Sequence, residues 1–218
     1  MRFEAMDQRS ARWYEARLGL PTASQFDRII TPGGKPASAD KVNTYLAELI
    51  AEKIFGFDEE KQEKISRQDA VRYGVERENE AAFALERELS KEFGNVLLQP
   101  GGFMWGDGDR YGCSPDRQLI EGNRKELAEI KCPTIPTQVK HVLYGPGENY
   151  KPQVQGQLLI SGYTAVHFYS YRHDCPPCHR VTMRDEAYIS TLRSLLEDFC
   201  DRLQRDYRRA REMGGWAT

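Results

Sequence analysis

A Gly-Asn pair at residues 122 and 123 separates two short polar-apolar segments, DRQLIE and RKELAEIK. Glycine at the first central position favours a two-residue type II′ turn, because this turn needs a positive φ there. In such a hairpin, paired residue numbers sum to 245, so Asp116 lies opposite Glu129. The segment from 116 to 131 is therefore predicted to be an antiparallel hairpin with a defined register.

The rest of the chain supplies patterns for helices and strands around this hairpin. Apolar residues recur at helical spacing in four segments: 41–57, 69–93, 151–162 and 185–212. Alternating, β-rich patterns occupy 165–172 and 179–184. The order predicts an α/β fold, with one domain over residues 1–218 built on a central mixed β-sheet flanked by helices.

The N-terminal region is predicted to hold a short helix, a turn and a second helix start within residues 12–30. Ser24 and Asp27 have the spacing of a capping box, which places a helix N-terminus at Ser24. The glycine- and proline-rich residues 31–39 indicate an exposed loop.

Composition narrows the class of protein without naming its partner. Hydrophobic residues make up 39% and charged residues 29%, which is typical of a globular chain. No apolar run approaches the roughly 18 residues that a membrane span needs, and MRFEAMDQRSARW lacks the apolar core of a signal peptide. Five cysteines favour reduced thiols in the cytoplasm. A net charge of −2 does not exclude nucleic acid, because binding depends on the local patch.

The hairpin brings three charged side chains together. Opposed residues have Cβ atoms about 5 Å apart, so Asp116 and Glu129 repel unless a cation lies between them. A hard divalent ion with oxygen ligands fits that gap. Lys131 lies two residues beyond Glu129 and shares its strand face, where it could orient or deprotonate a water. The alternative is a surface hairpin with scattered charges.

The same residues carry a resemblance. Ser114-Pro115-Asp116, a gap of twelve residues, and Glu129-Ile130-Lys131-Cys132-Pro133 together resemble the active-site motif of the PD-(D/E)xK nucleases. The chain is most similar to the phage lambda exonuclease-like branch, the YqaJ-type viral recombinases. Three further motifs match that branch in order: Arg17-Leu18-Gly19 with Thr22-Ala23-Ser24, Gly74 with Glu78-Asn79, and Gln153-Val154-Gln155.

The resemblance implies a restriction-endonuclease-like core and a role for each matching residue. Asp116, Glu129 and the backbone carbonyl of Ile130 are expected to hold metal. Lys131 is expected to assist the attacking water, with its pKa lowered by burial near the metal. The other expected site residues are Glu78 and Gln155 at the active centre and Arg17 and Ser24 at the 5′-phosphate of the DNA.

A helix start at Ser24 and the donor fork of Arg17 would both suit an anion, although Arg17 could equally form a surface ion pair. Glu78 and Gln155 could, without the resemblance, be ordinary polar helix residues.

The resemblance also implies an activity and partners. The expected reaction is Mg²⁺-dependent 5′-to-3′ degradation of one strand of linear double-stranded DNA, with two ions and with Mn²⁺ as a possible substitute. The expected assembly is a homotrimeric ring that works with a single-strand annealing protein. Alternatives are a restriction- or resolvase-like endonuclease and a non-enzymatic, zinc-stabilised DNA-binding module.

Two further segments carry candidate functional residues, and the first of them, residues 173–179, has no counterpart in the family pattern. The loop HDCPPCH could place four zinc ligands together, or could be a proline-stiffened reduced loop. Its candidate ligands are His173, Cys175, Cys178 and His179. The C-terminal helical pattern carries arginines that could contact DNA or a partner, or form the solvated face of an amphipathic helix: Arg202, Arg205, Arg208, Arg209 and Arg211.

Overall fold

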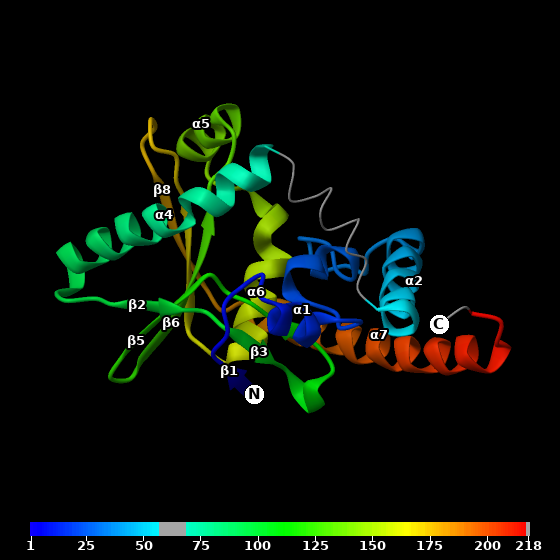
Figure 1. Ribbon diagram of the computed structural model, residues 1–218. Helices are drawn as coiled ribbons and strands as arrows, with labels where there is room; N and C mark the ends of the chain where they lie inside the picture. Colours follow the sequence, from blue (N-terminus) through cyan, green and yellow to red (C-terminus); the bar gives the residue numbers. More distant parts are fainter. Residues whose placement is uncertain (57–68, 217–218) are drawn as a thin grey trace.

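The computed structural model describes residues 1–56 and 69–216, and it centres on a five-stranded mixed sheet (Figure 1). The strand order is β2-β5-β6-β7-β8. The strands are β2 (Leu98–Pro100), β5 (Arg117–Glu121), β6 (Arg124–Lys131), β7 (Ala165–Ser170) and β8 (Cys178–Met183). Strands β6 and β7 are parallel, and the other neighbours are antiparallel. The predicted α/β fold with a mixed sheet is confirmed.

The β5–β6 hairpin has the predicted register. Arg117 pairs with Ala128 and Glu121 with Arg124, so paired numbers sum to 245. Gly122 has φ +56, whereas Asn123 is not among the described non-glycine residues with positive φ, which distinguishes type II′ from type I′. Asp116 lies one residue before β5.

Helices pack against both faces of this sheet. The helices in the described residues are α1 (Ala11–Arg17), α2 (Ala39–Phe55), α4 (Asp69–Phe93), α5 (Ile135–Tyr144), α6 (Lys151–Ser161) and α7 (Glu186–Met213). Helix α4 covers one face, because Ala81, Leu85 and Leu89 repeat at helical spacing and pack against Ala128 and Ile130 of β6. Helices α2, α6 and α7 share a larger core on the opposite face, and α5 and α6 lie in the crossover from β6 to β7.

Some elements differ from the sequence prediction. A second, three-stranded antiparallel sheet has the order β1-β3-β4, formed by β1 (Arg2–Glu4), β3 (Phe103–Trp105) and β4 (Gly112–Cys113). Its strands are two or three residues long, too short for an alternating pattern to show. Helix α5 was not predicted either. Two further short 3₁₀ helices are η2 (Asp107–Asp109) and η3 (Glu148–Tyr150).

The predicted capping box at Ser24 is wrong. Residues 23–28 form a 3₁₀ helix, η1 (Ala23–Arg28), whose N-cap is Thr22, and no side chain caps it. The N-cap lies two residues earlier than predicted, at Thr22, where the backbone N–H donates to the Tyr45 hydroxyl at 3.1 Å. Ser24 lies inside the 3₁₀ helix, so its hydroxyl does not cap the helix N-terminus.

Two general expectations concern the whole chain. None of the helices in the described residues combines the length and apolar character needed to cross a bilayer. All five cysteines are free thiols, as predicted.

Candidate active site

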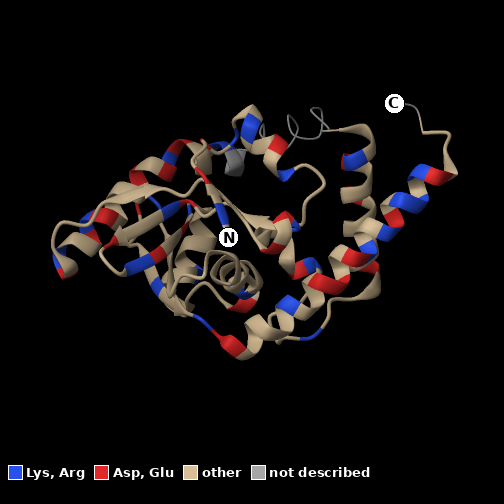
Figure 2. Ribbon diagram, turned by 90° about the horizontal axis from the view of Figure 1, so that it is seen from below, with Lys and Arg blue, Asp and Glu red and all other residues tan. Residues whose placement is uncertain are grey.

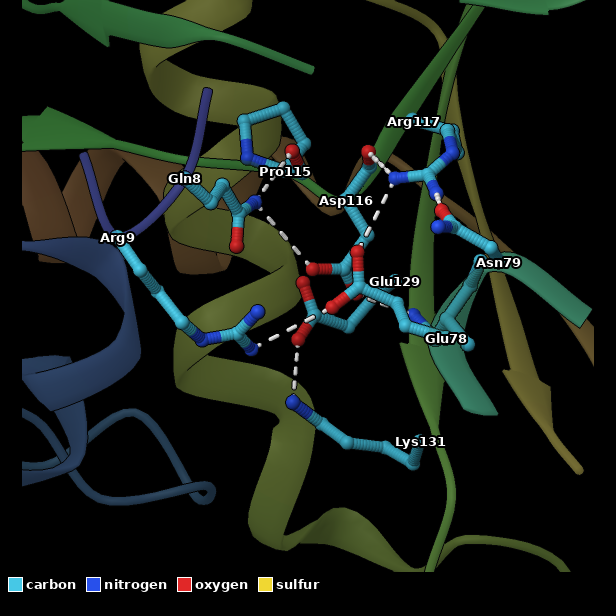
Figure 3. Close-up of polar contacts among 10 residues, drawn as sticks. Gln8, Arg9, Glu78, Asn79, Pro115, Asp116, Arg117, Glu129 and Lys131 are labelled. Carbon is cyan, nitrogen blue, oxygen red and sulfur yellow. Dashed lines mark hydrogen bonds and ion pairs between the residues drawn. The ribbon is translucent and has the colours of Figure 1, made fainter. Parts of the chain in front are cut away.

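The end of β6 and the start of β5 bring Asp116, Glu129 and Lys131 together (Figure 3). Glu129 and Lys131 share one face of β6, and the Lys131 ammonium contacts Glu129 Oε1. The Glu129 side chain is only 3% exposed, so this carboxylate is fixed within the protein.

Asp116 completes the pair from the opposite side of the hairpin. Its Oδ2 accepts a hydrogen bond from the Ile130 N–H at 2.6 Å, and its Oδ1 accepts a longer one from Gln8 Nε2 at 3.4 Å. Gln8 also donates to the Pro115 carbonyl at 3.1 Å. Strand β6 therefore positions both acids. Glu129 is one of its residues, and Asp116 is held by the backbone N–H of Ile130.

The electrostatics of this pair favour a cation. Burial, together with the negative charge of Glu129, raises the pKa of Asp116 to about 8. Burial lowers the pKa of Lys131, but the Glu129 and Asp116 carboxylates outweigh it and hold that pKa above its usual value. The predicted lowering of the Lys131 pKa by burial is thus not found, because the two carboxylates act against burial.

Glu78 joins the site from α4. Its carboxylate accepts hydrogen bonds from Arg117 at 3.1 Å and from Arg9 at 3.4 Å. Arg117 also donates to Asn79 at 2.7 Å and to the Asp116 carbonyl at 2.7 Å, so it ties α4 to the hairpin. The structure therefore brings Glu78 beside the other two acids, as the sequence predicted.

Gln155 does not reach the carboxylates. Its side chain donates to the Met183 carbonyl and accepts from the Asp185 N–H, both at 2.9 Å, on the far side of α6. The glutamines that contact Glu129 are Gln153, at 2.7 Å to Oε1, and Gln157, at 2.6 Å to Oε2. The helical period explains the correction, since residues four apart share a face and residues two apart do not.

Arg17 and Ser24 lie next to each other, as predicted. The Arg17 guanidinium donates to Thr22 Oγ1 at 3.2 Å and to Ser24 Oγ at 3.4 Å, and lies 4.1 Å from the centre of the Trp13 ring. Trp13 in turn donates to Ser114 Oγ at 2.7 Å. Ser114 is two residues from Asp116, so one chain of contacts connects this arginine to the carboxylate pair.

The site has the donor chemistry for a hard cation. Asp116, Glu129 and Glu78 supply carboxylate oxygens. Burial first, and then the charge of Glu129, raises the pKa of Asp116, and a divalent ion would offset both effects. Across the described residues, no three His, Cys, Asp or Glu side chains already surround a metal-sized point. Lys131 and the glutamine amides now satisfy Glu129, so ion binding requires these side chains to shift.

The HDCPPCH loop does not gather zinc ligands. His173 Nδ1 contacts Glu80 at 3.0 Å, whereas His179 bridges Glu88 and His167 at 2.9 Å each. Cys178 is buried in β8. The two histidines have different carboxylate partners, and the described residues hold no group of three or more His, Cys, Asp or Glu side chains placed to bind a metal ion, which does not support a zinc site.

The arginines at the end of α7 are interspersed with acids (Figure 2). Arg202 contacts Asp206 at 3.3 Å and Asn43 of α2 at 2.7 Å. This arrangement fits the solvated-helix interpretation, with one arginine fastening α7 to α2.

Comparison with known proteins identifies the family. A family model described as the YqaJ-like viral recombinase domain matches residues 12–164. The chain belongs to this family. The match confirms the resemblance and spans the segments that supply Arg17, Glu78, Asp116 and Glu129. No curated protein matches the chain.

Solved structures agree with the YqaJ-like assignment. The alkaline exonuclease LHK-Exo from Laribacter hongkongensis has 26% identity and a TM-score of 0.76, covering 94% of this chain and 100% of that chain. LHK-Exo in complex with dAMP gives a TM-score of 0.77 at the same identity and coverage. A phage related exonuclease from Haemophilus somnus 129PT, 13% identical, shares the fold with a TM-score of 0.63, covering 89% and 96% of the two chains. The YqaJ-like chain is therefore a nuclease.

Sequence reasoning missed several polar residues at the site: Gln8, Arg9, Arg117 and Gln157. Gln157 follows Gln153 by one helical turn, so the period of α6 could have identified it. Gln8 reaches Asp116 across 108 positions and Arg9 reaches Glu78 across 69, separations for which the local sequence carries no signal.

Proposed function

We propose that this protein is a Mg²⁺-dependent 5′-to-3′ exonuclease. It degrades one strand of linear double-stranded DNA from a 5′-phosphorylated end and leaves 3′ single-stranded overhangs for recombination by strand annealing. The observation that carries the proposal is the convergence of Asp116, Glu129 and Lys131 in a chain that belongs to the YqaJ-like family and matches an exonuclease structure over 94% of its length.

The residues of the site divide the work of phosphodiester hydrolysis. Asp116, Glu129 and the Ile130 carbonyl would hold Mg²⁺, or Mn²⁺ in its place, with Glu78 beside them. Two bound ions would lower the pKa of a water and steady the leaving oxygen. Gln153 and Gln157 fix Glu129, and the Lys131 ammonium beside it would present a positive charge to the scissile phosphate. This charge suits electrostatic stabilisation and orientation of the water more than removal of its proton.

The 5′-phosphate is proposed to bind at Arg17 and Ser24. The Arg17 guanidinium contacts two hydroxyl oxygens and the Trp13 ring in the described part of the chain, so it has donors to offer to an anion. The Trp13–Ser114 hydrogen bond supports the proposal, because it fixes the spacing between this pocket and Asp116.

The family resemblance supports four further parts of the proposal. The protein would assemble as a homotrimeric ring, act with a single-strand annealing protein, and work in the cytoplasm, as one domain over residues 1–218.

The test is digestion of end-labelled linear duplex with and without Mg²⁺, alongside covalently closed circular DNA. We expect Mg²⁺-dependent release of mononucleotides from the 5′-phosphorylated strand and an intact circle. Nicking or linearisation of the circle would favour a restriction- or resolvase-like endonuclease instead. Absence of any Mg²⁺-dependent cleavage would contradict the nuclease mechanism.

A further inference from the structure

Arg9 has a backbone conformation that arginine rarely adopts. Its φ is +68, in the left-handed region, and Asp109 is the other non-glycine residue with positive φ among residues 1–56 and 69–216. Side chains with a Cβ pay a steric penalty there of about 1 kcal/mol or more, which glycine avoids. Such residues concentrate at functional sites, where the surrounding structure holds them in place.

The neighbouring residues maintain this conformation. The Asp7 carbonyl accepts from the Ser10 N–H at 3.2 Å and from its hydroxyl at 2.7 Å, and Ser10 caps α1 through Trp13 N–H. The turn therefore directs two successive side chains into the site. Gln8 reaches Asp116, and Arg9 reaches Glu78 (Figure 3).

Arg9 is not needed to neutralise Glu78. Arg117 already contacts the same carboxylate at 3.1 Å, with a side chain only 15% exposed and further bonds to Asn79 and Asp116. Arg9 contacts Glu78 at 3.4 Å, and its side chain is 44% exposed. Arg9 is therefore bound to Glu78 more weakly than Arg117 is, and it lies nearer to solvent.

We propose that Arg9 binds a backbone phosphate of the DNA strand at the active site. A planar guanidinium presents paired donors that match two phosphate oxygens, and its exposed position leaves those donors accessible. When DNA enters, Arg9 leaves Glu78 to Arg117 and contacts the phosphate. This inference rests on the proposed nuclease function and adds a substrate-binding residue to it.

The strained backbone provides a discriminating test. Arg9→Gly removes the cation and also relieves the left-handed strain, so the metal-free variant should melt at the wild-type temperature or above it. Its affinity for 5′-phosphorylated duplex in Ca²⁺, and its digestion rate at limiting DNA in Mg²⁺, should nevertheless fall about 10-fold. The slope of log affinity against log salt concentration should decrease by about the value expected for one phosphate contact. Arg9→Lys should lie between wild type and Arg9→Gly.

Arg12→Ala is the matched control. Arg12 is three residues away, is 71% exposed and pairs with Glu4, so its loss removes the same charge outside the site. We expect DNA binding and digestion within about twofold of wild type, as for most surface positions.

Wild-type binding and digestion by Arg9→Gly would overturn the inference, as would equal losses in Arg12→Ala. Faster digestion by Arg9→Gly would show instead that Arg9 obstructs the site. If the wild type binds duplex in Ca²⁺ but never digests it in Mg²⁺, the proposed function fails, while the binding comparison still decides the role of Arg9. Absence of wild-type binding to DNA would overturn both.

Discussion

At the scale of single residues, Asp116 gives the site a measurable pH dependence. Burial and Glu129 raise the pKa of Asp116 to about 8 in the folded, metal-free protein, against an ordinary value near 3.8. Between these two pKa values the folded state keeps the Asp116 proton and the unfolded state loses it. The free energy of unfolding therefore falls as the pH rises from about 4 to about 8. Each unit of pKa shift corresponds to about 1.4 kcal/mol.

We expect Asp116→Asn to be more stable than wild type at pH 9 in EDTA, with a much smaller advantage at pH 5, because asparagine carries no charge to repel Glu129. Urea unfolding at the two pH values measures the difference. Saturating Mg²⁺ should raise wild-type stability at pH 9 and leave the variant nearly unchanged. Parallel pH profiles for the two proteins would contradict this account of Asp116.

The glutamines of α6 allow a second prediction. Gln157→Leu should lower the rate of digestion roughly 10- to 100-fold, because Glu129 loses a buried donor worth about 1.5–3 kcal/mol. Its affinity for Mn²⁺, measured by electron paramagnetic resonance, should weaken as well. Gln155→Leu is the matched comparison: it should lower the melting temperature and leave Mn²⁺ affinity intact, since Gln155 bonds to backbone near β8. The reverse pattern would restore the original assignment of Gln155.

For single residues, the prediction was right for two side chains on the same face of a strand. It was wrong for a helix, because the wrong face of α6 was assigned to the site. Glu129 and Lys131 lie two residues apart on β6 and share a face. Gln153 and Gln155 lie two residues apart on α6 and face opposite ways. The motif names both glutamines, and only the 3.6-residue period separates their roles.

At the scale of elements, local chemistry determined what could be predicted. The β5–β6 hairpin was predictable to the residue because Gly122 selects the turn, and the turn sets the register. The long helices were predictable from their apolar spacing. The β1-β3-β4 sheet was not, because pairs such as Phe3 with Met104 form over 100 residues apart.

Asp185 joins two of these elements and supports a third prediction. Its carboxylate caps α7 through the Tyr188 N–H at 3.0 Å and pairs with Lys151 of α6 at 3.0 Å. The Tyr188 amide and the Lys151 ammonium lower the pKa of Asp185. Asp185→Ala should lower the melting temperature by about 2–4 °C at pH 7, as expected for the loss of an N-cap.

The pH dependence of this effect follows from the lowered pKa. A carboxylate with a depressed folded pKa stabilises the protein above its ordinary pKa and loses that contribution as pH falls through the folded pKa. The gap between wild type and Asp185→Ala should therefore narrow below pH 4. Asp185→Asn, which keeps an oxygen for the cap, should lose less at pH 7. A difference in melting temperature between wild type and Asp185→Ala that stays constant down to acid pH would argue against a stabilising role for the charge of Asp185.

At the scale of the whole molecule, the phosphate pocket should control how DNA ends are processed. Duplex with a 5′-hydroxyl should be digested more slowly than duplex with a 5′-phosphate, and Arg17→Ala should shrink that difference. The reason is that the Trp13–Ser114 contact fixes the pocket relative to Asp116, so a captured phosphate sets the register of the strand. Single-turnover digestion of both substrates measures the ratio. Equal wild-type rates on the two ends would remove the basis for the pocket.

The proposed ring can be tested without DNA. Sedimentation equilibrium should give a mass three times the 25.1 kDa of one chain. A mass of one or two chains, unchanged across protein concentration, would contradict the trimer while leaving the exonuclease proposal open.

The long-range contacts of the active site also have a consequence for biosynthesis. Gln8 contacts Asp116, which lies 108 residues later in the chain. Glu129 is held by Gln157, which lies 28 residues after it. On the ribosome, the two acids emerge well before α6 supplies the amides that fix Glu129. A nascent or prematurely terminated chain ending before Gln157 therefore carries both acids without an assembled catalytic centre. If these residues act as proposed, the order of synthesis delays the DNA-degrading activity until most of the polypeptide exists.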